Sequence, residues 1–280
     1  MIYLGTAGWS YPHWRGTFYP RDVENLNELE YYSHYSQLNE INNTFYHIPS
    51  EHMVQRWYHS TPDDFIFSAK LIREVTHSGR HTRLASKLDK ITEFFTRLAR
   101  LEEKLQVILV QFPPSLRKTP ETLSYLSRVL DKCSGHFSGQ IVLEIRNKSW
   151  FSDDFKDLLS EKAITLAETT MLNIPDKYRN KDISLYYIRL LGDRRIIPDE
   201  KLGKFFLEKK QERKDWSRKI IRLSKPYDTI FVLINNRFSG YAINDAIALR
   251  KIFTKENIPA QGFENADKYI RRQMSLREFF

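Results

Sequence analysis

The 280-residue sequence contains a single cysteine, Cys133, and therefore cannot form a disulfide bond within the chain. Disulfide bonds are typical of oxidising compartments, and the cysteine content does not indicate one. No apolar run approaches the roughly 18 residues that are needed to cross a membrane. The N-terminus enters a predicted strand directly, without the charged and apolar regions of a signal peptide. We therefore expect a soluble, cytoplasmic protein.

Linkers and repeats are also missing from the sequence. There is no Pro/Gly/Ser-rich linker, no low-complexity tract and no repeat at the period of a solenoid. Hydrophobic residues make up 41% of the chain and aromatic residues 14%, which is enough for a sizeable core. The length would allow two domains, but α/β barrels commonly use about 250 residues as one. The expected organisation is a single domain over residues 1–280.

Eight short apolar runs recur along the chain, and nearly every one ends in a polar or charged residue. The runs cover residues 2–6, 38–42, 65–70, 107–111, 141–146, 164–168, 185–189 and 230–235. Segments with helical periodicity separate most of them. This alternation predicts the α/β class, as a single (β/α)8 TIM-type barrel with parallel strands. In such a barrel the carboxyl ends of the strands meet at one mouth, where active sites lie.

Three strand-end residues are the predicted catalytic groups: Glu40, Lys70 and Glu144. Alternate strand residues share a face, so Glu40 is expected to point into the barrel. A carboxylate inside a barrel is costly unless it is paired, and its candidate partners are Lys70, Arg146 and Arg189. A purely structural buried ion pair is the alternative interpretation. Lys70 itself could serve as a general base, a Schiff-base amine or a phosphate ligand.

Arg146 and Arg189 are suited to bidentate capture of a carboxylate or phosphate. Together with Lys70 they would face at most three carboxylates, those of Glu40, Glu144 and Glu168. If Glu168 turns away, the mouth carries a net positive charge. We therefore expect an anion to bind within hydrogen-bonding reach of Arg146 or Arg189.

Further residues near the strand ends are predicted to bind substrate. They are Trp9, Tyr11, Asn42, Tyr46, His77, Gln111, Asn235 and Asn236. The aromatic residues in the first loop either pack over the mouth or form a stacking surface for a planar ligand. The asparagine amides suit recognition of a sugar or a base, and His77 could act as a proton shuttle or be an ordinary loop histidine.

The sequence predicts no metal ion and no cofactor. Glu40, Glu144, Glu168 and His77 could meet at the mouth, but no pair has the spacing of a metal-binding motif. Three cations nearby would also repel a divalent ion. The spacing of Gly5 and Gly8 in the first loop does not match a dinucleotide-binding or P-loop fingerprint. Nucleophile candidates are weak as well, since Ser68 lacks the Gly-x-Ser-x-Gly elbow and Cys133 ends a predicted helix.

The net charge of +9 is unevenly placed. Residues 194–225 hold twelve Lys/Arg and five Asp/Glu, in a predicted loop followed by a helix. Such a segment could attract the phosphates of a nucleic acid. The alternative is a solvated helix with i,i+4 ion pairs.

Several motifs together resemble a known family. They are residues 5–11 with Trp14 and 18–20, residues 40–46 with 49–50, residues 65–70 with 76–77, residues 111–114, residues 144–146 with 149–150, and residues 235–236 with 240–242 and Ala246. This set resembles the DUF72 (YecE-like) family over almost the whole chain. The resemblance implies a TIM-type barrel, which has been likened at the level of fold to endonuclease and sugar isomerase barrels, and it implies no settled activity. Where members often show Arg-x-His-Gly, this chain has Arg189-Leu190-Leu191-Gly192, so no histidine role is expected there.

Two classes of function follow. The first is an enzyme acting on a small or nucleotide-like anionic substrate, a phosphate or carboxylate, with Glu40 or Glu144 as general acid/base. Within it, a hydrolase or lyase acting on a phosphorylated substrate is the best single guess. The alternative is a nucleic-acid-binding or nucleolytic protein that uses residues 194–225 and the aromatics of the first loop. No membrane partner is expected, and the sequence does not predict an oligomeric state.

Overall fold

The computed structural model describes residues 1–21, 27–77, 84–204, 206–264 and 266. It divides into two compact units. The first unit comprises Met1–Glu40, Ser60–Phe65 and Ile188–Phe280, and the second comprises Ile41–His59 and Ile66–Tyr187. The prediction of a single domain stays a prediction, and each unit is described by itself.

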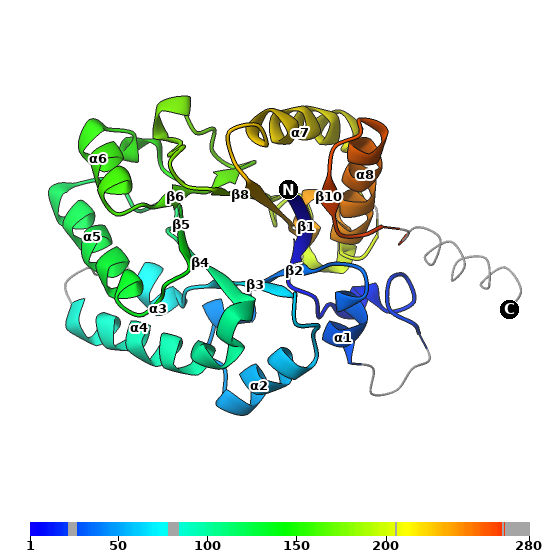
Figure 1. Ribbon diagram of the computed structural model, residues 1–280, viewed down its shortest axis with the longest axis horizontal. Helices are drawn as coiled ribbons and strands as arrows, with labels where there is room; N and C mark the ends of the chain where they lie inside the picture. Colours follow the sequence, from blue (N-terminus) through cyan, green and yellow to red (C-terminus); the bar gives the residue numbers. More distant parts are fainter. Residues whose placement is uncertain (22–26, 78–83, 205, 265, 267–280) are drawn as a thin grey trace, which may run out of the picture. The chain divides into compact units, whose positions relative to one another are not determined.

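α-Helices separate most of the strands along the described part of the chain, as the periodicity predicts, although none separates β6, β7 and β8 (Figure 1). The strands are β1 (Ile2–Ala7), β2 (Leu38–Ile41), β3 (Ile66–Lys70), β4 (Leu105–Gln111), β5 (Gln140–Glu144), β6 (Thr165–Leu166), β7 (Glu168–Thr169), β8 (Leu185–Leu190), β9 (Thr229–Ile234) and β10 (Ala260–Gln261). The α-helices are α1 (Glu28–Ser33), α2 (Glu51–His59), α3 (Arg73–Thr76), α4 (Leu84–Leu98), α5 (Pro120–Ser134), α6 (Asp153–Glu161), α7 (Lys210–Leu223) and α8 (Ala242–Lys255). Short 3₁₀ helices are η1 (Pro12–Trp14), η2 (Asn43–Phe45), η3 (Ala99–Lys104), η4 (Lys148–Trp150), η5 (Asp176–Tyr178), η6 (Asp199–Lys201) and η7 (Asn236–Phe238).

In the second unit, β3, β4, β5 and β6 are consecutive neighbours in a parallel sheet. Their side chains are buried almost throughout, because α4, α5 and α6 follow one another along one side of these strands (Figure 1). Buried parallel strands read as continuous apolar runs, which explains the sequence pattern. Helix α5 begins at a capping box, in which Thr119 and Thr122 each bind the other's backbone N–H, with Pro120 at the first helical position.

In the first unit, β1 is paired in parallel with β2, β9 and β10. Helix α8 packs against β1, and α7 packs against α8. Gly5 lies where the backbone of β1 approaches the Leu38 carbonyl of β2 so closely that a Cβ would not fit. Close contact between these two strands therefore requires a glycine at this position.

All eight apolar runs contain a strand, so the strand predictions are confirmed. The sixth run is divided at Ala167 into β6 and β7, and the fifth strand ends at Glu144, before Arg146. The basic segment is a loop followed by α7, as predicted, although residue 205 is outside the described part. Among the helices that the structure describes, none is long and apolar enough to span a membrane.

Candidate functional site

Three predicted site residues lie side by side on one face of the second unit's sheet. Lys70 pairs in register with Leu109, two residues before Gln111 on β4, and Gln111 pairs with Glu144 on β5. Because alternate strand residues share a face, Lys70, Gln111 and Glu144 point to the same side of the sheet. All three side chains are buried. Each is at the last residue of its strand, so the row marks the carboxyl ends of β3, β4 and β5.

Arg146 is held beside this row by Glu144. Its Nε donates to Glu144 Oε1 at 2.6 Å, and the Glu144 side chain is fully buried whereas that of Arg146 is 24% exposed. Among the residues that the structure describes, none accepts a hydrogen bond from the two terminal NH₂ groups of Arg146. The guanidinium is therefore oriented by one carboxylate and keeps its outer donors available for a ligand.

The Phe45 ring lies against the Lys70 end of this row. The ammonium of Lys70 lies 3.8 Å from the centroid of the Phe45 ring, a cation–π contact. The same ring makes edge contacts with Tyr46 at 5.2 Å and with His77 at 4.8 Å. Thr44 attaches η2 to β3, because its hydroxyl donates to the backbone carbonyl of Lys70 at 2.7 Å. Tyr46 is 66% exposed, so its ring remains open to a ligand.

His77 lies between α3 and the end of β4. Its Nδ1 is 2.8 Å from Thr76 Oγ1, and its Nε2 is 3.3 Å from Gln111 Nε2. Burial, and after it the positive charges of Lys70 and Arg146, lower the pKa of His77 to about 4. The imidazole is therefore neutral at pH 7, which does not favour the proton-shuttle role considered from the sequence. Asn42 precedes η2 and is partly exposed.

In the first unit, Glu40 and Arg189 form a buried ion pair. Nε of Arg189 is 2.8 Å from Glu40 Oε2, and Nη2 is 2.5 Å from Oε1. Both side chains are almost fully buried. Lys70, Arg146 and Arg189 were the candidate partners of Glu40, and within this unit Glu40 binds Arg189. The pair matches the structural alternative, since the fork of Arg189 is directed at a protein carboxylate.

The other predicted site residues of the first unit form hydrogen bonds with residues of the same unit. Asn236 Oδ1 accepts from Trp14 Nε1 at 3.1 Å and from the Ala242 amide at 3.0 Å. Asn235 Oδ1 accepts from the amide of Arg237, so it caps η7. The Tyr11 hydroxyl donates to the Ala7 carbonyl, and its ring packs at 4.8 Å on Trp14. Trp9 is partly exposed, and its carbonyl accepts from the Tyr19 hydroxyl at 2.6 Å. Most of these aromatics pack on one another.

Arg179 binds Glu168 and was not among the residues predicted from the sequence. Arg179 Nη2 is 2.8 Å from Glu168 Oε2, and the Tyr186 hydroxyl donates to the same oxygen at 3.1 Å. Glu168 was expected either to face the strand-end cations as a third carboxylate or to turn away from the mouth. Its carboxylate binds Arg179 in the loop that follows β7. Arg179 is in a loop rather than at a strand end, so no pattern in the sequence indicated it.

No three His, Cys, Asp or Glu side chains within the described ranges lie close enough together to hold a metal ion. His52 and His59 are on α2 and His34 ends α1, while His81 lies outside the described residues. Ser68 Oγ is 2.7 Å from the Tyr187 hydroxyl. Cys133 is buried in α5, and burial raises the pKa of its thiol well above the usual range.

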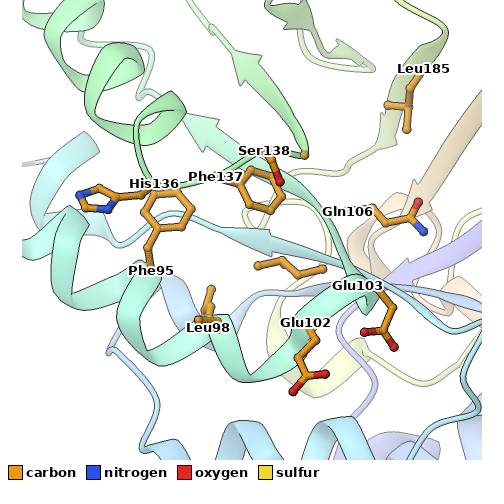
Figure 2. A pocket seen from close by; sticks show the side chains of 12 residues that line it. Phe95, Leu98, Glu102, Glu103, Gln106, His136, Phe137, Ser138 and Leu185 are labelled. Carbon is orange, nitrogen blue, oxygen red and sulfur yellow. The ribbon is translucent and has the colours of Figure 1, made fainter.

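A separate cavity of about 570 Å³ lies in the second unit, and none of the predicted site residues lines it (Figure 2). Phe95, Leu98 and Leu105 form its apolar wall, and Glu102 and Glu103 lie at one side. Leu105 and Leu185 are the first residues of β4 and β8. The cavity is therefore at the amino ends of the strands, where α/β barrels carry stability rather than catalysis.

Several cations of residues 194–225 form ion pairs with nearby carboxylates. Lys209 binds Glu212, Arg218 binds Asp215, and Arg213 binds both Glu208 and Asp245. These pairs agree with the alternative of a solvated, ion-paired helix. Exposed cations remain at i,i+4 spacing along α7, at Lys210, Lys214, Arg218 and Arg222.

Comparison with known proteins gives one family and several relatives. The family described as "Protein of unknown function DUF72" matches residues 3–267. The protein YunF of Bacillus subtilis (strain 168) is 27% identical over 267 residues, which is 88% of this chain and 92% of YunF. The protein YecE of Escherichia coli (strain K12) is 30% identical over 154 residues, which is 54% of this chain and 51% of YecE.

Solved structures are also similar. A DUF72 family protein from Thermotoga maritima matches with a TM-score of 0.73 at 23% identity, covering 91% of this chain and 99% of that chain. One from Enterococcus faecalis matches with a TM-score of 0.71 at 24% identity, covering 94% and 98%. SacUVDE matches with a TM-score of 0.59 at 12% identity, covering 92% and 99%. These likenesses show the fold alone, and the predicted class, an α/β barrel of the TIM type with parallel strands, is confirmed.

Proposed function

The chain belongs to the DUF72 family of unknown function, and we propose that it is an enzyme acting on a small phosphate or carboxylate bound at the carboxyl ends of β3, β4 and β5. The site consists of Lys70, Gln111, Glu144, Arg146 and the neighbouring Phe45. Its two cations and one carboxylate sum to a formal charge of +1, which favours an anionic ligand.

The observation that carries this proposal is the difference between the two candidate arginines. Arg189 directs Nε and Nη2 at both oxygens of Glu40, whereas Arg146 gives only Nε to Glu144. A carboxylate or phosphate needs two parallel N–H donors for bidentate binding. The terminal donors of Arg146 supply this geometry, so we assign anion binding to Arg146 and a positioning role to Arg189.

We assign the acid–base chemistry to Glu144 and Lys70. Glu144 is fully buried, and Arg146 orients its carboxylate at 2.6 Å. Lys70 is positioned by the Phe45 ring, and its charge acts on the same imidazole as that of Arg146. A buried carboxylate and a buried amine near one bound anion can transfer protons to and from it, as in a hydrolase or lyase acting on a phosphorylated substrate. We assign no acid–base role to Glu40, because its carboxylate binds Arg189.

The test is the titration of inorganic phosphate and a nucleoside monophosphate into the wild type, Arg146→Ala and a control. Arg128→Ala is a matched control, because Arg128 is exposed on α5 of the same unit. We expect Arg146→Ala to weaken binding by roughly 1.5–3 kcal/mol, the value of a charge-assisted contact. Arg128→Ala should bind as the wild type does. Equal affinity in all three proteins would contradict the proposal, as would a divalent metal that binds tightly and abolishes anion binding.

Nucleic-acid binding is the second candidate, and the exposed cations along α7 favour it. Lys210, Lys214, Arg218 and Arg222 lie at i,i+4 intervals and therefore on one side of the helix. Replacing Lys214 and Arg222 together by alanine should lower the salt dependence of oligonucleotide binding by about 0.9 per lost phosphate contact. An unchanged slope would exclude α7 as the interface.

A further inference from the structure

Gln111 is almost completely buried at the centre of the candidate site, with 2% of its surface exposed. Its Nε2 is 2.8 Å from the backbone carbonyl of Phe112. A carbonyl oxygen only accepts hydrogen bonds, so the NH₂ group of the amide must be the end that faces it. This contact determines the orientation of the side-chain amide without reference to any ligand.

The same NH₂ group determines the tautomer of His77. Because Gln111 Nε2 is a donor, His77 Nε2 at 3.3 Å must be the unprotonated acceptor. The ring proton is then on Nδ1, where it donates to Thr76 Oγ1 at 2.8 Å. A protonated imidazole would place a second N–H against the NH₂ group of the Gln111 amide, so this contact favours the neutral ring. His77 and Phe112 thus hold the Gln111 amide from two sides.

One consequence concerns the amide oxygen, Gln111 Oε1, which accepts no hydrogen bond from any residue in the part of the chain that the structure describes. It is not among the fully buried polar atoms that lack a partner, so this oxygen keeps some contact with solvent. A ligand that covered it without donating a hydrogen bond would leave it without a partner, which costs free energy. Gln111 cannot remove this cost by rotating its amide, since its NH₂ group already has two acceptors.

The position of this acceptor indicates its partner. Gln111 is between Lys70 and Glu144 on the same face of the sheet, and Glu144 holds Arg146. A donor group on the ligand would therefore have to lie close to the anion that Arg146 binds. The charges of Lys70 and Arg146 also lower the pKa of His77, whose imidazole contacts the Gln111 amide at 3.3 Å.

We infer that the site selects a hydroxylated small anion, whose phosphate or carboxylate group binds Arg146 and whose neighbouring hydroxyl donates to Gln111 Oε1. This inference rests on the proposed function and narrows its substrate class. His77 is a positioning residue in this arrangement, because it acts on the ligand only by holding the Gln111 amide. A site built around a hydrogen bond discriminates strongly against an analogue that lacks the hydroxyl.

The experiment compares two probes that differ in their hydroxyl groups, glycerol 1-phosphate and propyl phosphate. The wild type should bind glycerol 1-phosphate on the order of tenfold more tightly, the equivalent of one hydrogen bond. Gln111→Met removes the acceptor at similar volume, so the ratio of the two affinities should fall to about one. Arg146→Ala should weaken both probes by a similar factor and keep their ratio.

The outcomes separate this inference from the proposed function. If neither phosphate binds the wild type, the proposed function fails. If both bind the wild type equally, or Gln111→Met keeps the preference, the hydroxyl inference alone is overturned. Imidazole ¹⁵N shifts of the wild type give a second measurement that needs no variant and no ligand. They should show the proton on His77 Nδ1, and a proton on Nε2 would refute the orientation of Gln111.

Discussion

Arg189 binds both carboxylate oxygens of Glu40, with Nε at 2.8 Å from one and Nη2 at 2.5 Å from the other. The two residues are 149 positions apart in the sequence, and neither side chain is exposed to more than a few per cent. Burial removes water from both charges, and the attraction between them offsets this cost only while the pair is intact. The pair is therefore expected to matter first for stability.

We expect single replacements in this pair to destabilise the protein strongly. Arg189→Met or Glu40→Leu leaves one buried charge without its partner, which typically costs about 3–5 kcal/mol. The double replacement Glu40→Leu with Arg189→Met should cost less than the sum of the two single changes, because it removes both members of the pair together. Urea unfolding at pH 7 measures all three variants. Losses below about 1 kcal/mol for both single variants would show that the pair is not a stability element.

The fold was predictable from the sequence because a parallel barrel has a strong local signature. Each buried strand is a short apolar run, and each run ends in a polar residue where the strand leaves the core. The alternation needs no knowledge of distant contacts. The break at Ala167 was not predictable, since β6 and β7 differ from one strand only in their pairing.

The site was predictable in composition but not in pairing. The row of Lys70, Gln111 and Glu144 follows from strand ends and alternation, which are local properties. The sequence could not distinguish Arg146 from Arg189 as the proposed anion ligand, because that difference depends on which guanidinium nitrogens a carboxylate occupies. The contact of Phe45 with Lys70 and the orientation of Gln111 likewise depend on rotamers and register.

Asp245 provides a pH-dependent contribution to stability that can be measured apart from the site. Burial raises the pKa of its carboxyl to about 6, although Ser239 and Arg213 act in the opposite direction. The folded value is above that of an exposed aspartate, near 3.9, so the folded state binds the proton more tightly. The stability from this group is therefore fully present below about pH 4 and is lost as the pH rises through about 6.

Asp245→Asn removes this titration, and its stability relative to the wild type should improve as the pH rises from 4 to 7. The comparison concerns the trend with pH, since Asp245→Asn also replaces the carboxyl group that Arg213 Nη1 contacts at 2.8 Å. Urea unfolding at several pH values measures it, with Asp157→Asn, an exposed position on α6, as control. A difference between variant and wild type that does not change with pH would contradict the raised pKa.

His77 should remain neutral throughout the physiological range. Its pKa of about 4, caused first by burial and then by Lys70, is below the value of 6.5 for an exposed imidazole. A lowered folded pKa means that the contribution to stability is present above about pH 6.5 and is lost as the pH falls toward 4. The ring ¹³Cε1 shift of His77 should therefore stay constant from pH 8 to about 5. An inflection near 6.5 would contradict this.

The same neutrality determines how ligand binding depends on pH. A phosphate monoester gains its second charge near pH 6, so its affinity for the cations Lys70 and Arg146 should rise from pH 5 to 7 and then level off. If His77 were a third cation, it would lose its positive charge near pH 6.5. This loss would oppose the rise in affinity and lower the affinity above neutral pH. Calorimetric titration of glycerol 1-phosphate between pH 5 and 8 distinguishes the two profiles. The profile of His77→Gln should have the shape of the wild-type profile, because the imidazole carries no charge to lose.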